Sequence, residues 1–142
     1  MNNKLEASKL MLRVILGISF FVHGLVKFQG GIENTVGWFD SIGIPGVLAY
    51  VVALIEMVGG FALIIGLGTR IVSALISLVM IGAIFTAKLS VGFLGDGQTP
   101  GAGYELDLAF LAIALFLAIN GSKMLAVDQL FINKSENEQA GK

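Results

Sequence analysis

The sequence predicts an all-α integral membrane protein, a four-helix bundle with one short interfacial helix in its first external loop. Of its 142 residues, 56% are hydrophobic and only 13% charged, whereas a soluble domain is about 45–50% apolar and about 25% charged. Four apolar stretches, at residues 8–28, 47–67, 71–94 and 104–120, approach the roughly 20 residues that a membrane-spanning helix needs. Residues 1–132 are therefore expected to form one domain, followed by a polar, disordered tail at residues 133–142.

Lys4 and Lys9 precede the apolar run of the first stretch, which therefore resembles the start of a signal peptide. It lacks an Ala-x-Ala-like cleavage site, and it carries His23 and Lys27 where a processed peptide would end, so we expect a retained helix. After it, Ile32, Val36 and Phe39 recur at helical spacing with Trp38 beside them. This spacing predicts the short helix at the membrane interface.

The second stretch ends in Gly66-Leu67-Gly68-Thr69-Arg70. A glycine stop followed by a threonine suited to cap the next helix predicts a tight hairpin between the second and third spans. A glycine-rich segment at residues 95–103 then leads into the fourth span, and we interpret it as a flexible turn.

Basic residues predict the orientation in a bacterial plasma membrane. Of the nine lysines and arginines, only Lys27 and Lys88 fall toward one side of the predicted spans. The positive-inside rule therefore places both termini in the cytoplasm. The other seven are Lys4, Lys9, Arg13, Arg70, Lys123, Lys134 and Lys142.

Composition also excludes several kinds of chemistry. The absence of cysteine removes thiolate nucleophiles, iron–sulfur clusters and cysteine-ligated zinc. His23 is the single histidine, so no metal site is expected. A net charge of −1 gives no basic surface for nucleic acid. No dinucleotide-binding glycine motif or haem-ligand pair is evident, so no bound cofactor is predicted.

Ionisable residues within spans are costly and mark functional sites. Arg13 and Lys27 share one face of the first helix with Gly17, Phe20 and Gly24, because these positions recur at spacings of four and three. The glycines make this face the expected packing seam.

Glu56 lies at the middle of the second span, where an isolated carboxylate would protonate. By helical rise, Arg13 and His23 are at similar distances from it. Arg13 would form a structural ion pair with Glu56, whereas His23 would form a proton-exchanging couple with it. The sequence leaves both alternatives open.

A pocket is expected in the outer half of the bundle. Lys88, late in the third span, should pair with an acidic residue that opens the fourth, Glu105 or Asp107. Structural roles are the alternative: Lys27 snorkelling to the interface, the acids at a helix N-terminus, and Trp38 and Tyr104 in an aromatic belt. The candidate catalytic residues are Glu56, His23 and Lys88, and the candidate substrate-binding residues are Lys27, Trp38, Tyr104, Glu105 and Asp107.

These residues resemble the DoxX family of small bacterial membrane proteins, from Leu12 to Asp128. Each motif is weak alone, but the set is specific. The motifs are Leu12-Arg13-Val14, Gly17, Phe20, His23-Gly24-Leu25-Val26-Lys27-Phe28, Glu56-Met57-Val58-Gly59-Gly60, Gly66-Leu67-Gly68-Thr69-Arg70, Lys88 and Gly103-Tyr104-Glu105-Leu106-Asp107-Leu108-Ala109.

Within that family the chain looks most like the small oxidoreductases that catechol and quinone stress induces in Gram-positive bacteria. The resemblance implies a four-helix membrane bundle and a role in quinone or hydroquinone redox handling. Other members resemble a subunit of a thiosulfate:quinone oxidoreductase, but this chain has no cysteine for sulfur chemistry.

Three functions follow as hypotheses. The leading one is a membrane protein that binds a quinone or catechol ring between its helices and helps to reduce it, with electrons from a redox partner protein or a loosely bound cofactor. The second is a non-enzymatic scaffold whose polar residues join helices and stabilise a separate redox enzyme. The third is a permeation or export module, which so few spans would support best as a homo-oligomer.

Overall fold

The computed structural model describes residues 2–98 and 103–141, and within these ranges every regular element is helical. Residues 99–102, part of the predicted glycine-rich turn, lie outside the described residues. The elements in chain order are α1 (Asn3–Gln29), α2 (Ile32–Ser41), α3 (Val47–Ile65), α4 (Thr69–Ala83), the π-helical turn η1 (Ile84–Lys88), α5 (Glu105–Asn120) and α6 (Val127–Ala140).

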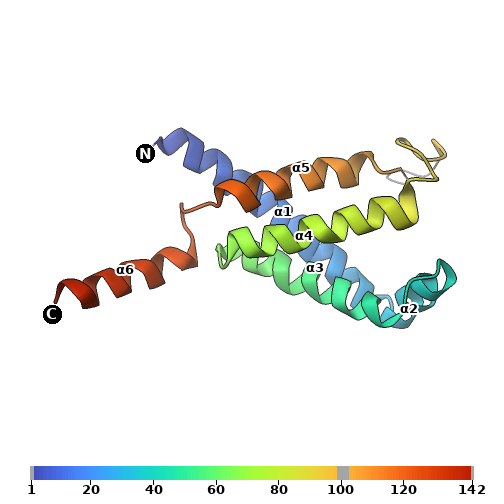
Figure 1. Cartoon of the computed structure of the whole chain (residues 1–142), viewed down its shortest axis with the longest axis horizontal. Coiled ribbons are helices and arrows are strands. Elements are labelled where there is room, and N and C mark those ends of the chain that lie inside the picture. The colour runs from blue at the N-terminus through green and yellow to red at the C-terminus, as the bar shows by residue number, and fades with distance from the viewer. Residues whose placement is uncertain (1, 99–102, 142) are drawn as a thin grey trace.

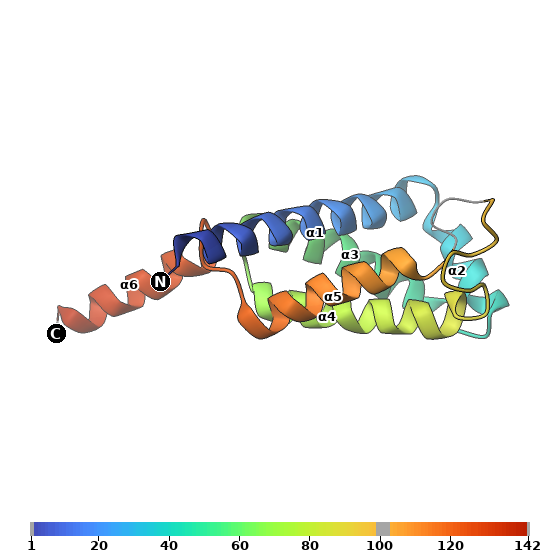
Figure 2. The same cartoon turned by 90° about the horizontal axis from the view of Figure 1, so that it is seen from above.

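The long helices pack side by side around one apolar core. α1 packs on α3, α4 packs on both α3 and α5, and α1 also contacts α5, so these four helices run together along the long axis of the molecule (Figures 1 and 2). α2 lies across one end of them, whereas α6 projects away from the opposite end. The buried core consists of Leu16, Phe20, Leu63, Ile76, Met80, Ala114 and Leu117.

In the part of the chain that the structure describes, three helices are long and apolar enough to cross a membrane: α1, α3 and the continuous segment from Thr69 to Lys88. α5 has sixteen residues, which rise about 24 Å at 1.5 Å each, less than the roughly 30 Å of a hydrocarbon core. The four-span bundle therefore stays a prediction. A short helix is present where the sequence predicts one, at α2, and its position at a membrane interface also remains a prediction.

Glycines hold α1 and α3 in close contact. A Cβ atom at Gly17 would lie 2.8 Å from the Gly60 carbonyl oxygen, and one at Gly24 would lie 2.7 Å from the Met57 Cβ. Neither position has room for a side chain, because real Cβ contacts are longer than this. The seam predicted on the Gly17 and Gly24 face of the first helix is thus present, and Gly60 is its counterpart on α3.

The helix boundaries differ by more than two residues from the predicted ones at two places. α1 begins at Asn3 rather than near residue 8, because the Asn2 side chain accepts a hydrogen bond from the Lys4 backbone N–H at 3.1 Å and caps the helix. The third predicted span ends at Lys88 rather than residue 94. Gly92 follows with a φ of 96°, a left-handed conformation that does not continue a helix.

The hairpin between α3 and α4 is capped differently from the prediction. Thr69 is the first residue of α4 and not its cap. Gly68 precedes it, and its backbone N–H donates to both Asp128 carboxylate oxygens, at 2.9 and 3.0 Å. A carboxylate from the far end of the chain therefore caps α4, which local sequence cannot reveal.

The C-terminal tail is helical where the sequence indicates disorder. α6 includes residues 133–140, and none of its residues is buried. Its polar composition is compatible with a solvated helix as well as with a disordered segment, so composition alone did not distinguish them.

Substitution at the glycine seam is expected to destabilise the fold. Gly60→Ala places a methyl group 2.7 Å from the Gly17 carbonyl oxygen and against the Phe21 backbone, so we expect a loss of about 1–3 kcal/mol. Gly82→Ala is the matched control, because a Cβ at this helical glycine meets nothing within 4 Å. Thermal unfolding in mild detergent should show a lower midpoint for Gly60→Ala alone, and equal midpoints would contradict the seam.

Candidate functional site

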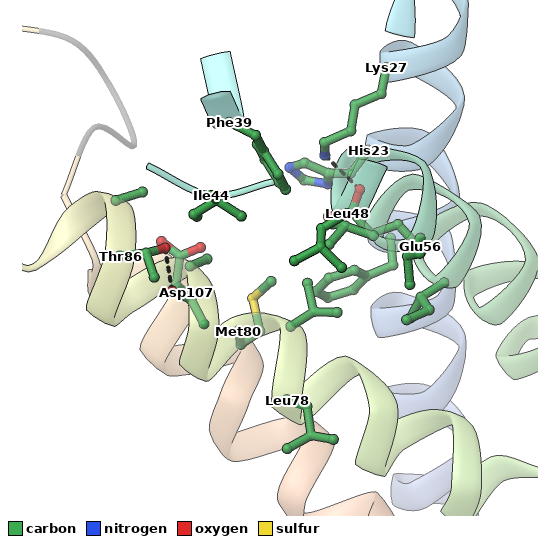
Figure 3. Close-up of a pocket in the computed structure, with 18 of the residues that line it drawn as sticks. His23, Lys27, Phe39, Ile44, Leu48, Glu56, Leu78, Met80, Thr86 and Asp107 are labelled. Carbon is green, nitrogen blue, oxygen red and sulfur yellow. Dashed lines mark hydrogen bonds and ion pairs between the residues drawn. The ribbon is translucent and has the colours of Figure 1, made fainter. Parts of the chain in front are cut away.

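A cavity of about 720 Å³ lies between α1, α3, α4 and α5, at the end of the molecule that α2 covers. Most of its lining is apolar, with aromatic side chains on several sides. A small number of ionisable groups lie within this wall, and Figure 3 shows how they are distributed. The ionisable side chains that line the cavity are His23, Lys27, Glu56, Lys88 and Asp107.

The first polar group is an ion pair between α1 and α3. The Lys27 ammonium donates to a Glu56 carboxylate oxygen at 2.5 Å, and Glu56 is buried, with 5% of its surface exposed. The sequence left Arg13 and His23 as the possible partners of Glu56. The structure pairs Glu56 with Lys27 instead. Lys27 lies in the last turn of α1, and its long side chain reaches a carboxylate deeper in the bundle. The prediction compared only the positions of backbone atoms along the helix axis, so it did not include this reach.

Arg13 lies at the other end of the bundle and does not contribute to the cavity. It is fully buried, and its Nη2 donates to the Leu125 carbonyl at 3.0 Å, while Nη1 lies 3.4 Å from both the carbonyl and the hydroxyl of Ser122. No salt bridge in the described part of the chain involves Arg13. The expected structural ion pair is thus replaced by an anchor for the segment between α5 and α6.

His23 presents an imidazole ring to the cavity from α1 (Figure 3). Its Nδ1 lies 2.6 Å from the Ser19 carbonyl oxygen, and since a carbonyl only accepts, Nδ1 carries the hydrogen. In the neutral ring Nε2 is then the acceptor. The ring also contacts Phe20 and Phe110, with centroids 6.1 and 6.4 Å away.

The second ion pair joins η1 to α5. The Lys88 ammonium donates to an Asp107 carboxylate oxygen at 2.7 Å, as expected for opposite charges at similar depth. Lys88 ends a π-helical turn, in which the Leu89 N–H donates to the Ile84 carbonyl at 2.8 Å, five residues back. Such turns are rare in proteins, and those that occur are often found at functional sites. Figure 3 shows Lys27 and Glu56 on one side of the cavity and Asp107 with Thr86 on the other.

Six of the nine candidate residues come together in this cavity. Tyr104 does not line it and instead packs edge-on against Phe93, with centroids 5.4 Å apart. Glu105 is exposed, and its backbone N–H donates to the Phe93 carbonyl at 3.1 Å. The six that line the cavity are His23, Lys27, Trp38, Glu56, Lys88 and Asp107.

Sequence reasoning missed several apolar residues of the wall. Phe110 lies one helical turn after Asp107, so helical spacing from that acid could have indicated it. Ile44 lies between α2 and α3, and Leu48 lies in the first turn of α3. No pattern in the sequence distinguishes them from other apolar residues. Among the residues that the structure describes, no three His, Asp or Glu side chains lie close enough to hold a metal ion.

Comparison with known proteins identifies the family. The sequence model of the DoxX family matches residues 8–89, which run from within α1 through α2, α3 and α4 to the end of η1. The chain belongs to the DoxX family. This DoxX protein is 46% identical over 137 residues to the Bacillus subtilis protein named "Putative oxidoreductase CatD", with 96% of each chain covered.

Two further relatives are named as membrane proteins. An uncharacterized membrane protein of Mycobacterium tuberculosis is 30% identical over 130 residues, covering 86% of this chain and 80% of its own. Inner membrane protein YqjF of Escherichia coli is 29% identical over 135 residues, covering 91% of this chain and 95% of its own. No solved structure matches the chain. Together with its apolar helices, these relatives show that the chain is a membrane protein.

The Lys27–Glu56 pair gives a stability prediction. Lys27→Met leaves the buried Glu56 without a partner, so we expect a loss of roughly 3–5 kcal/mol. The double variant Lys27→Met/Glu56→Gln removes both charges and should recover most of this loss. Thermal unfolding in detergent measures the difference, with Lys134→Met on exposed α6 as the lysine control. If the single and double variants unfold alike, the pair is not coupled.

Proposed function

We propose that the cavity binds the ring of a quinone, hydroquinone or catechol, and that the protein takes part in quinone reduction at the bacterial plasma membrane, with both termini in the cytoplasm. One observation carries the proposal. Two lysine–carboxylate pairs line one largely apolar cavity. Lys27–Glu56 joins α1 to α3, and Lys88–Asp107 joins η1 to α5. A planar apolar ring with oxygens at its edge matches such a distribution of polar groups.

The size and polarity of the cavity fit this ligand class. Small-molecule sites are about 300–1,000 Å³, mostly apolar, with a few polar groups that fix orientation. An ammonium carries three N–H donors, so a lysine can donate to a ring oxygen while it remains paired with its carboxylate. Phe20 and Phe110, whose rings lie 5.4 Å apart edge-on, supply aromatic surface for the ring.

Quinone reduction to hydroquinone needs two electrons and two protons. Glu56 and His23 are proposed to relay the two protons, because both line the cavity and carboxylates and imidazoles are common general acids and bases. Each takes up a proton before it passes one to the ring. The electrons come from a separate reductant, a redox partner protein or a reduced diffusible cofactor. The oxidoreductase named among the relatives supports this reaction class.

Ring binding can be tested through Trp38, the single tryptophan of the chain, which lines the cavity. A tail-less benzoquinone titrated into the purified protein should quench its fluorescence saturably. Lys88→Met should weaken binding by roughly ten- to a hundredfold, since a hydrogen bond from a charged donor contributes about 1.5–3 kcal/mol. Lys134→Met, on exposed α6, should bind like the parent. Linear, unsaturable quenching by the parent protein would refute the proposal.

Catalysis can be tested in cells exposed to catechol. Glu56→Gln keeps the shape of the side chain but cannot take up or release a proton. We therefore expect the rate of quinone reduction, measured in membranes supplied with reductant, to fall about 10²- to 10⁴-fold. Cells that carry this variant should lose their protection against catechol. Membrane abundance, measured by immunoblot, should stay unchanged. Full protection by Glu56→Gln would exclude it as the proton donor.

The second candidate function is that of a non-enzymatic subunit that stabilises a separate redox enzyme. The exposed helix α6 favours it. This helix projects from the bundle (Figure 1), and two of its large apolar side chains, Leu130 and Phe131, are 69% and 65% exposed. Such a surface fits a partner protein. Co-purification of one stoichiometric redox enzyme that is lost in Leu130→Ser/Phe131→Ser, with no activity in the isolated chain, would favour this function over the first.

A further inference from the structure

We infer that the cavity opens sideways into the bilayer between α3 and α4, and that its ligand is a lipid-soluble quinone whose apolar chain lies in this opening. The inference rests on the proposed function, since it specifies which quinones the same site takes. It distinguishes a membrane quinone from a small catechol dissolved in water. Three observations carry it: the divergence of two helices, the exposure of the residues at the rim, and the cover that α2 provides.

α3 and α4 are close at their hairpin and separate toward α2. Near the hairpin, a Cβ atom at Gly59 would lie 3.1 Å from the Val72 side chain, so the two helices nearly touch there. Figure 1 shows them moving apart from this end toward the end that carries α2. Residues of both helices line the cavity within this separation.

Four apolar side chains at this opening belong to the cavity wall and to the outer surface at once. Leu48 and Val51 of α3 are 42% and 46% exposed, and Leu75 and Leu78 of α4 are 41% and 66% exposed, yet all four line the cavity. A residue that is on both surfaces marks a rim. Both helices belong to candidate membrane spans, so the surroundings of this rim are acyl chains.

The end of the cavity toward α2 is partly covered. Phe39, on α2, is buried, with 9% of its surface exposed, and it lines the cavity together with Ile44. Figure 3 shows both side chains over the space between Lys27 and Asp107. The connection is fixed, because the Ile44 N–H donates to the Phe39 carbonyl at 2.9 Å and the Gly46 N–H donates to Asp40 at 2.8 Å. Phe39 and Ile44 therefore narrow the cavity at this end, where Trp38 of α2 also lines it and is 48% exposed.

The positions of the polar groups give the ligand its shape. The carboxylates Glu56 and Asp107 are buried, with 5% and 8% of their surface exposed, whereas the four rim residues of α3 and α4 are aliphatic. A ligand that satisfies both regions has a polar ring at one end and an apolar chain at the other, with the chain continuing into the lipid. Membrane quinones have this form, whereas catechol itself has no group to fill the rim.

The test compares two ligands and two protein variants in lipid nanodiscs. The ligands are one benzoquinone ring without a chain and the same ring with a decyl chain, and their binding is followed through Trp38. Val51→Phe/Leu78→Phe fills the rim with larger side chains. Ile119→Phe is the control, since Ile119 on α5 is 70% exposed and does not line the cavity. The two ligands partition differently into the lipid, which changes their apparent affinities. This effect is the same for every protein variant, so it cancels when a variant is compared with the parent for the same ligand.

We expect the rim variant to weaken binding of the decyl quinone at least about tenfold more than binding of the chainless ring. The control variant should weaken neither. Equal effects on both ligands, or a rim variant that behaves like Ile119→Phe, would overturn the inference while the proposed ring site stands. If neither ligand binds the parent protein saturably, the proposed function fails as well.

Discussion

The contact between α1 and α3 determines where every polar group of the cavity lies. Gly17 and Gly24 on α1 and Gly60 on α3 leave no space for side chains between the two backbones, so the helices cannot slide past each other without a clash. This fixed register brings Lys27 to Glu56. It also leaves Arg13 beside Gly66 at the hairpin, where its partners are backbone carbonyls of the segment after α5.

The two ends of the bundle differ in chemistry because they differ in packing. At the hairpin end, the Asp128 carboxylate caps α4 and the Arg13 side chain holds the chain before α6, so polar groups there satisfy backbone atoms. At the end that α2 covers, α3 and α4 separate, and charged side chains pair with each other around a cavity. Groups of the first kind stabilise the fold, whereas groups of the second kind remain in reach of a ligand.

Much of this arrangement could be predicted from local pattern. Apolar runs and glycine positions predicted the helices, the α1 seam and the α3–α4 hairpin, and equal depth predicted the pairing of Lys88 with an acid that opens α5. The errors have a common cause. The contacts that the sequence did not predict depend on how far a side chain reaches or on residues that are distant in the chain. Rise per residue alone did not show that Lys27 would extend to Glu56, and no local rule connects Asp128 to Gly68. Tyr104 was expected in the pocket from its neighbours in sequence, but its ring turns to Phe93.

The π-helical turn has a consequence for the register of the chain. Each residue of an α-helix advances about 100° around the axis, and a π turn accommodates one additional residue in the same length of helix. Without η1, Lys88 would therefore point about a quarter turn away from its present direction, and Asp107 on the neighbouring helix would lose the ammonium that it accepts from. In a family of such short proteins, the insertion or deletion of one residue here would change the charge facing the cavity while leaving every helix in place.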